Sequence, residues 1–239
     1  MSCPVILASL STICSLMEAS EWTRTSLIGH RAAVNCLCLE PEGGLCSGSD
    51  DGSVRLWDLR TSRSVKCIAG ESPVTDVHLM DGLLYSSSGN AVRAHDLRTE
   101  RIVIQQPLQL QEFPVEEIAV MQTHPSAGYY VIADDKGVLY IHHPRTGQLR
   151  KIHSRKGHSQ EVASIAFHPR SRYEMITGGY DYRCLLWDSS CNHPKRIFDF
   201  SSLEAMQTSV LIPPFVFSVK YLCDGDVIAC ALGNGNVSV

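Results

Sequence analysis

The stretch of sequence that decides the fold is residues 29–60, which read GHRAAVNCLCLEPEGGLCSGSDDGSVRLWDLR. It opens with the pair Gly29-His30, continues with an alternating apolar run from Val34, and closes with Trp57-Asp58-Leu59-Arg60. Alternation of apolar and other residues over a short run is typical of half-buried strands. The acidic and small residues of Asp50–Ser53 predict a tight hairpin turn within the stretch. Residues 29–60 are therefore expected to form three short strands.

The same arrangement returns from Gly157-His158 to Trp187-Asp188. Aligned by the inward aliphatic residue of the first strand, successive units begin at Val34, Val74, Ile118 and Val162. The steps between these residues are 40, 44 and 44 positions, the repeat length of a four-stranded propeller blade. No helical pattern separates the strands, which argues against a parallel α/β sheet. The predicted fold class is all-β, a radial array of antiparallel sheets.

The repeats place blades near residues 29–69, 70–104, 114–153, 157–200 and 215–239. Residues 201–214 lengthen one step and are expected to form an inserted inter-blade loop. Residues 1–16 carry no repeat and are expected to be an extension outside the fold, which leaves 17–239 as a partial propeller. About four and a half blades are thus expected, the last one stopping in its third strand. Because open sheet edges invite association, we expect a fragment, a truncated form or one whose edges a partner covers.

Composition restricts the class of protein. The formal net charge of −4 gives no global basic field for nucleic acid, and no apolar run reaches the length needed to span a membrane. None of the ten cysteines lies in a C-x-x-C pair, which favours reduced thiols in an intracellular protein of the cytoplasm or nucleus. The apolar residues from Pro4 to Met17 follow no Lys or Arg, unlike a secretory signal.

The paired motifs Gly29-His30 with Trp57-Asp58, and Gly157-His158 with Trp187-Asp188, resemble the signature of the WD-repeat family. The resemblance covers residues 22–239 and implies a WD-repeat β-propeller whose ring is incomplete. Two units carry the full signature and three are degenerate. In the degenerate units Glu71 stands at the position of His30, His95 at the position of Trp57, and His142-His143 at the position of a Trp-Asp pair.

The resemblance implies a four-residue hydrogen-bond chain that locks each complete blade. Its members would be His30, Ser47, Asp51 and Trp57 in the first unit, and His158, Thr177, Asp181 and Trp187 in the fourth. The residue types suit this role, because a carboxylate accepts from His, a hydroxyl relays, and an indole N–H donates. Each such bond contributes about 1 kcal/mol net.

A catalytic or metal-binding role for the same histidines is the alternative, since each set superficially resembles a Ser-His-Asp triad. We disfavour it because these residues are expected to face between strands and not into a cleft. No further ligands at suitable spacing accompany His142-His143, and no Gly-rich phosphate loop appears. The prediction is a protein that is not an enzyme, with no metal and no cofactor.

The motif Trp57-Asp58-Leu59-Arg60 carries the functional hypothesis. In the WD-repeat family, Trp-Asp-x-Arg at the end of the third strand marks proteins that dock on the damaged-DNA-binding-protein-1 adaptor of cullin-4 ubiquitin ligases. The adaptor-binding residues implied here are Trp57, Asp58, Arg60, Asp96 and Arg98, the last two from the half-preserved motif of the second unit. The fourth unit has Ser190 in place of this Arg. The simpler interpretation is that Arg60 and Arg98 are solvated turn residues.

Two further readings stay open. The first is a general protein- or histone-peptide-binding propeller without a ligase link, again with no small-molecule substrate. The second concerns the basic and histidine-rich residues 142–158, which could form a phosphate or nucleic-acid patch. No aromatic residues interleave there to stack bases, so a solvated fourth strand with its loops is favoured.

Overall fold

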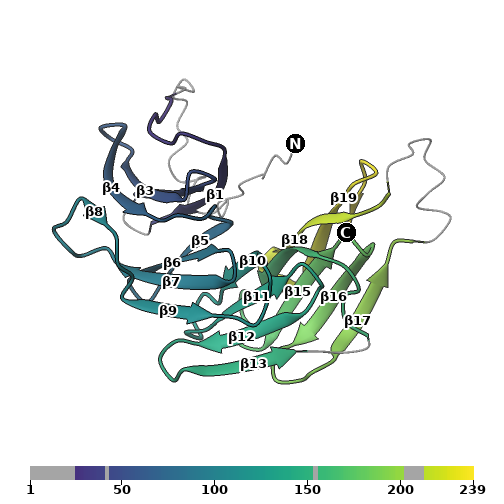
Figure 1. Ribbon diagram of the computed structural model, residues 1–239. Coiled ribbons are helices and arrows are strands. Elements are labelled where there is room, and N and C mark those ends of the chain that lie inside the picture. Colours follow the sequence, from purple (N-terminus) through teal and green to yellow (C-terminus); the bar gives the residue numbers. More distant parts are fainter. Residues whose placement is uncertain (1–24, 41–42, 153–155, 202–212) are drawn as a thin grey trace.

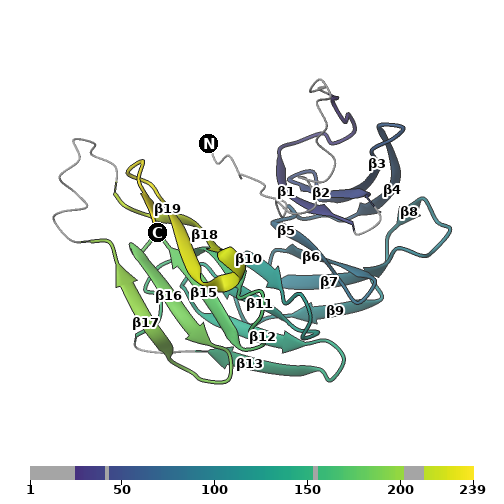
Figure 2. The ribbon, with the colours of Figure 1, turned by 180° about the vertical axis from the view of Figure 1, so that it is seen from behind.

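The computed structural model describes residues 25–40, 43–152, 156–201 and 213–239 (Figure 1). These residues form five β-sheets that follow one another along the chain and are arranged as an open array (Figures 1 and 2). The first strands of neighbouring sheets contact one another, from β1 through β5, β10 and β14 to β18. The predicted all-β propeller class is confirmed, and the described sheets do not close into a ring.

We call the sheets blades 1 to 5. Blade 1 contains β1 (Val34–Leu39), β2 (Leu45–Ser49), β3 (Ser53–Asp58), β4 (Arg63–Ala69) and, at its edge, β8 (Val103–Ile104). Blade 2 contains β5 (Asp76–Met80), β6 (Leu83–Ser88), β7 (Ala91–Asp96) and β9 (Gln109–Glu112). Blade 3 contains β10 (Ile118–Thr123), β11 (Tyr130–Asp134), β12 (Leu139–His143) and β13 (Gln148–Ile152).

Blade 4 contains β14 (Val162–Phe167), β15 (Glu174–Gly179), β16 (Arg183–Asp188) and β17 (Pro194–Asp199). Blade 5 contains β18 (Val216–Leu222), β19 (Val227–Leu232) and β20 (Val237–Ser238), with the short 3-10 turn η1 (Cys223–Gly225) between the first two. No helix in the described part of the chain is long and apolar enough to cross a membrane.

Strand pairing within each blade follows from short antiparallel hairpins. In blade 1 the β2–β3 hairpin turns at Gly52, whose φ of 77° lies in the region that favours glycine. The first strand shifts register in four of the five blades, for example between Val34 and Cys36. Such a shift is a β-bulge, and it bends the strand where the chain enters each blade.

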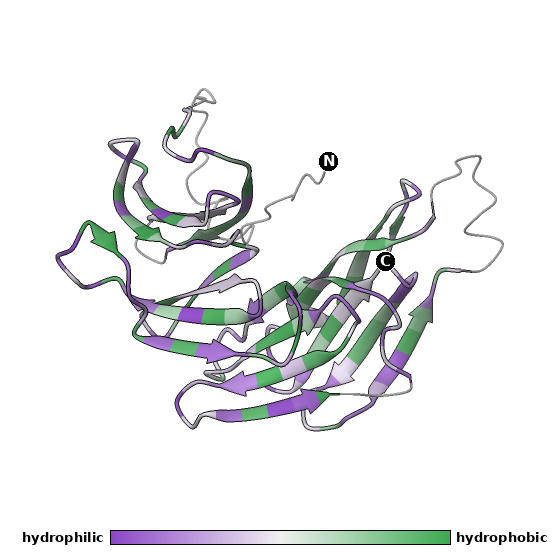
Figure 3. Cartoon of the chain, in the orientation of Figure 1, coloured by the Kyte–Doolittle hydropathy of each residue, from purple (hydrophilic) through white to green (hydrophobic). Residues whose placement is uncertain are grey.

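The core lies between blades and not in one central cluster. Small residues in the second strand let the next blade approach: a Cβ at Gly48 would lie 2.6 Å from Val74, and one at Gly178 would lie 2.5 Å from Val216. Strands in the middle of the array, such as β11, are buried throughout, whereas the outer strand β9 is largely exposed. Figure 3 shows the same contrast, with hydrophobic colour concentrated on the inner strands.

The predicted end of the second blade near residue 104 is wrong. Val103 and Ile104 pair in parallel with Cys67 and Ile68 of β4, and β9 supplies the fourth strand of blade 2. The cause is packing, because Ile104 is 7% exposed and joins the apolar cluster shared by blades 1 and 2. The predicted extension at residues 1–16 and all but the ends of the inserted loop at 201–214 lie outside the described residues.

Candidate functional site

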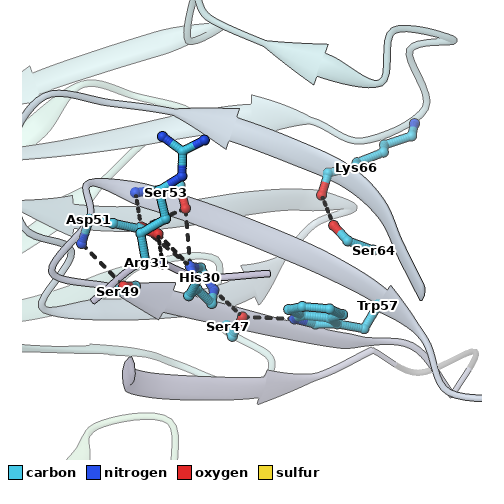
Figure 4. Close-up of polar contacts among 9 residues, drawn as sticks. All are labelled: His30, Arg31, Ser47, Ser49, Asp51, Ser53, Trp57, Ser64 and Lys66. Carbon is cyan, nitrogen blue, oxygen red and sulfur yellow. Dashed lines mark hydrogen bonds and ion pairs between the residues drawn. The ribbon is translucent and has the colours of Figure 1, made fainter. Parts of the chain in front are cut away.

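The four predicted residues of blade 1 lie together between the entry loop and the first hairpin (Figure 4). The Nε2 of His30 lies 2.7 Å from the hydroxyl of Ser47, and Trp57 donates its indole N–H to the same hydroxyl at 2.8 Å. The Nδ1 of His30 lies 3.2 Å from a carboxylate oxygen of Asp51. These contacts link the turn of the hairpin to the third strand.

Blade 4 repeats this geometry with a threonine in place of the serine. The hydroxyl of Thr177 lies 2.7 Å from Nε2 of His158 and accepts the indole N–H of Trp187 at 2.8 Å. The Nδ1 of His158 lies 2.8 Å from Asp181. The set is almost wholly enclosed, because the side chain of His158 is 0% exposed and that of Asp181 is 3% exposed.

The hydrogen-bond partners of the two histidines suit one arrangement of donors and acceptors. Since the indole N–H occupies one lone pair of the hydroxyl, the hydroxyl proton is available to Nε2 of the histidine. When Nε2 accepts in this way, Nδ1 carries a ring proton and donates it to the carboxylate. Burial raises the pKa of Asp181, but the hydrogen bond from His158 and the backbone N–H of Ser159 outweigh burial and lower it overall.

This arrangement stabilises a blade and offers no opening for a substrate. Ser47 is 3% exposed and Thr177 is 0% exposed, so neither hydroxyl can reach a reacting group outside the blade. Each hydroxyl already relays between an indole and an imidazole, whereas a nucleophile needs a free path to its substrate. The described residues contain no group of three or more His, Cys, Asp or Glu that could hold a metal ion.

Sequence reasoning missed Ser53, which belongs to the blade 1 network. Its hydroxyl donates to Asp51 at 2.6 Å and lies 3.1 Å from Nδ1 of His30. Burial raises the pKa of Asp51, but hydrogen bonds from Ser53 and from the backbone N–H of Arg31 lower it strongly overall. The signal was present, because Asp followed two residues later by Ser in a hairpin turn is a common hydrogen-bonded turn pattern.

Blades 2 and 3 keep the fold but have lost this network. His95 and His142 occupy the position of Trp57 in their blades, since each lies opposite the first residues of its second strand. They are 2% and 5% exposed, and neither ring nitrogen of either residue has a hydrogen-bond partner among the described residues. Burial lowers the pKa of both, that of His95 to about 4 with a contribution from Arg93, so both rings are neutral near pH 7.

The residues predicted to bind an adaptor lie at the ends of β3 and β7. The backbone N–H of Arg60 donates to Asp58 at 2.9 Å, and that of Arg98 donates to Asp96 at 2.9 Å. In blade 4 the N–H of Ser190 makes the equivalent bond to Asp188. The aspartate of the motif therefore closes a turn in three blades.

The two arginines differ in how they use their guanidinium groups. Arg98 forms a two-pronged contact with Asp96 at 2.9 and 2.8 Å, which lowers the pKa of Asp96 to about 2. Arg60 only approaches Asp58, with Nε 3.5 Å from a carboxylate oxygen. The side chains of Arg60 and Arg98 are 91% and 80% exposed. Both are open to a partner, and Arg60 has the larger number of uncommitted donors.

Trp57 cannot play the predicted part of a direct adaptor contact. It is 3% exposed and its indole N–H is committed to Ser47. Its indole is part of the interior of the blade, so it can only position the turn that follows. The side chains of Asp58 and Asp96 are partly exposed, at 24% and 34%.

The chain is similar to known proteins along most of its length. The family WD40 (WD domain, G-beta repeat) matches residues 22–58 and 149–188. A WD repeat-containing protein 53 homolog of Dictyostelium discoideum is 28% identical over 90% of this chain, which spans 64% of the length of that protein. The mitotic checkpoint protein bub-3 of Caenorhabditis elegans is 26% identical over 94% of this chain and 70% of its own length.

Proposed function

We propose that this chain, two segments of which match the WD40 family, is a non-catalytic protein-interaction scaffold that docks, as a substrate receptor, on the damaged-DNA-binding-protein-1 adaptor of a cullin-4 ubiquitin ligase. The observation that carries the proposal is the pair of exposed arginines, Arg60 and Arg98, that follow the third strands of blades 1 and 2. An adaptor-facing surface needs cations that a neighbouring protein can reach, and both side chains meet that requirement.

The turn geometry supports recognition of a specific partner. Asp58 and Asp96 hold the backbone of the two arginines in equivalent turns, so the two cations leave neighbouring blades from the same repeat position. A guanidinium recognises carboxylates and carbonyls through a planar fork of donors. Two guanidinium groups at a fixed spacing select a partner by geometry as well as by charge.

A binding measurement with purified adaptor tests the proposal. The double variant Arg60→Ala/Arg98→Ala is compared with the wild type and with the matched control Arg63→Ala/Arg101→Ala. Both variants remove two exposed cations from the same segments of the chain, so their net charges are equal. We expect the first to lose about tenfold or more in affinity, because charge-assisted contacts are lost, and the control to bind like the wild type.

Two results would count against the ligase link. Equal binding by the two double variants would show that the equivalent repeat positions of Arg60 and Arg98 are irrelevant to docking. Absence of binding by the folded wild-type chain would leave only the coarser function, a scaffold for other proteins. Circular dichroism of each variant separates loss of docking from loss of fold.

A further inference from the structure

A pocket of about 450 Å³ lies between blades 1 and 2. It is lined by Gly70, Glu71, Ser86 and His95, which are the repeat equivalents of Gly29, His30, Ser47 and Trp57 in blade 1. In blade 1 the imidazole of His30 fills the space between hydroxyl and carboxylate. In blade 2 the side chain at that position, Glu71, is exposed, so the corresponding space is open.

A buried and unsatisfied group faces this pocket. His95 is 2% exposed, and neither of its ring nitrogens has a hydrogen-bond partner within the described residues. A buried polar group without a partner is costly, so an occupant that supplies partners gains free energy from the site. A neutral imidazole needs one acceptor for its N–H and one donor for its other nitrogen.

The charges around the pocket specify the kind of acceptor. Arg93, which is half-buried, is the cation of its lining, and the hydroxyl of Ser86 adds a further donor. The carboxylate of Glu71 lies at the exposed rim, so the lining carries no net charge and suits a monoanion better than a phosphate dianion. Val54 and Ile68 of blade 1 supply apolar walls that fit a short methylene chain.

We propose that this pocket binds an acidic side chain presented by a peptide segment of a partner protein. The side-chain carboxylate meets Arg93 and the N–H of His95, and a backbone N–H of the same segment donates to the other ring nitrogen. On this assignment a peptide should fit better than a free acid, because the free acid lacks the donor. The proposal is independent of adaptor docking, since neither Arg60 nor Arg98 lines the pocket.

Calorimetry with the full chain and three probes tests this inference. The probes are the capped peptides acetyl-Gly-Glu-Gly-amide and acetyl-Gly-Gln-Gly-amide, and glutarate. We expect the Glu peptide to bind about tenfold or more tightly than the Gln peptide, because only the former makes a charge-assisted bond to Arg93. Equal affinity for the two peptides, or no heat from either, would overturn the proposal. Glutarate binding as tightly as the Glu peptide would overturn the assignment to a peptide.

Two variants with opposite expected signs locate the binding in this pocket. Arg93→Gln should weaken the Glu peptide about tenfold or more, because the guanidinium is lost. Glu71→Gln should tighten it about two- to threefold, because a like charge at the rim is removed. Misfolding cannot produce tighter binding, so the second variant keeps the test valid if the first fails to fold. Unchanged affinity in Glu71→Gln and in a folded Arg93→Gln would place the peptide elsewhere and refute the site.

Discussion

Replacing Thr177 by valine removes a single hydroxyl at nearly constant volume and breaks the blade 4 network at its centre. That hydroxyl is the partner of both the Trp187 indole, at 2.8 Å, and His158 Nε2, at 2.7 Å. The three side chains are almost wholly buried, so water cannot substitute for the lost partner. We expect the variant to fold into the same blades with a lower free energy of unfolding.

The size of the loss follows from these contacts. Two hydrogen bonds of about 1 kcal/mol each are lost, and the indole N–H is left buried without an acceptor at a further cost of about 1–3 kcal/mol. The expected total is about 3–5 kcal/mol, a large share of the ~5–15 kcal/mol that keeps a typical domain folded. Thr177→Ser keeps the hydroxyl and deletes one methyl group, so it should cost only about 1 kcal/mol.

Equilibrium unfolding in urea, followed by tryptophan fluorescence, measures the difference. The valine variant should unfold at a midpoint lower by about 1–2 M, with the serine variant between it and the wild type. Ser159→Ala is the matched control, because Ser159 is exposed and next to His158, and its midpoint should stay within error of the wild type. If valine proved as stable as serine at position 177, the network would contribute nothing and our account of the complete blades would be wrong.

Three further predictions concern other residues. The pKa of His95 falls from about 6.5 in the unfolded chain to about 4 in the blade, so the free energy of unfolding is highest above pH 6.5 and declines by about 3 kcal/mol as the pH falls to 4. In His95→Phe this cause of pH dependence is removed, so the urea midpoint should change less between pH 6.5 and pH 4. Gly178→Ala should lower the free energy of unfolding by about 1–3 kcal/mol, because the added methyl group would clash with Val216. In a double-mutant cycle, Val216→Ala should relieve the clash, so that Gly178→Ala costs less in that background than in the wild type. Ser53→Ala should lower the free energy of unfolding by about 1–2 kcal/mol, because a hydrogen bond to Asp51 is lost. The same change raises the lowered pKa of Asp51, so an acid titration should show a smaller loss of stability below pH 4 than in the wild type.

Features repeated in the chain could be predicted from the sequence. The period from Val34 to Val162 gives the order and spacing of the first four blades, because every blade must supply the same alternating strands to its neighbours. The members of both complete networks could be named in advance, since a Gly-His pair and a Trp-Asp pair at fixed spacing leave few other partners. The geometry places those eight residues together as two hydrogen-bonded sets.

Features in which one blade departs from the repeat could not be predicted from the sequence. Val103 and Ile104 are β-branched and suit a strand, but the sequence does not show that this strand pairs with blade 1. The apolar cluster around Ile68, which Ile104 joins, favours that pairing. The substitution of His95 for a tryptophan is visible in the sequence, but whether its nitrogens would find new partners depends on side chains from another blade. The burial of Trp57 shows the same limit, because a motif does not say which of its residues faces the solvent.

The parallel pairing of β8 with β4 has a consequence for how the chain is made. Along the chain, β8 follows the third strand of blade 2, yet its hydrogen bonds and those of the preceding residue complete the edge of blade 1, with Cys67 donating to the carbonyl of Ile102. Lys66 adds contacts to the carbonyls of Leu97 and Thr99 in the same connection. We therefore expect the edge of blade 1 to stay incomplete during synthesis until most of blade 2 has left the ribosome, and the two blades to fold as one cooperative unit.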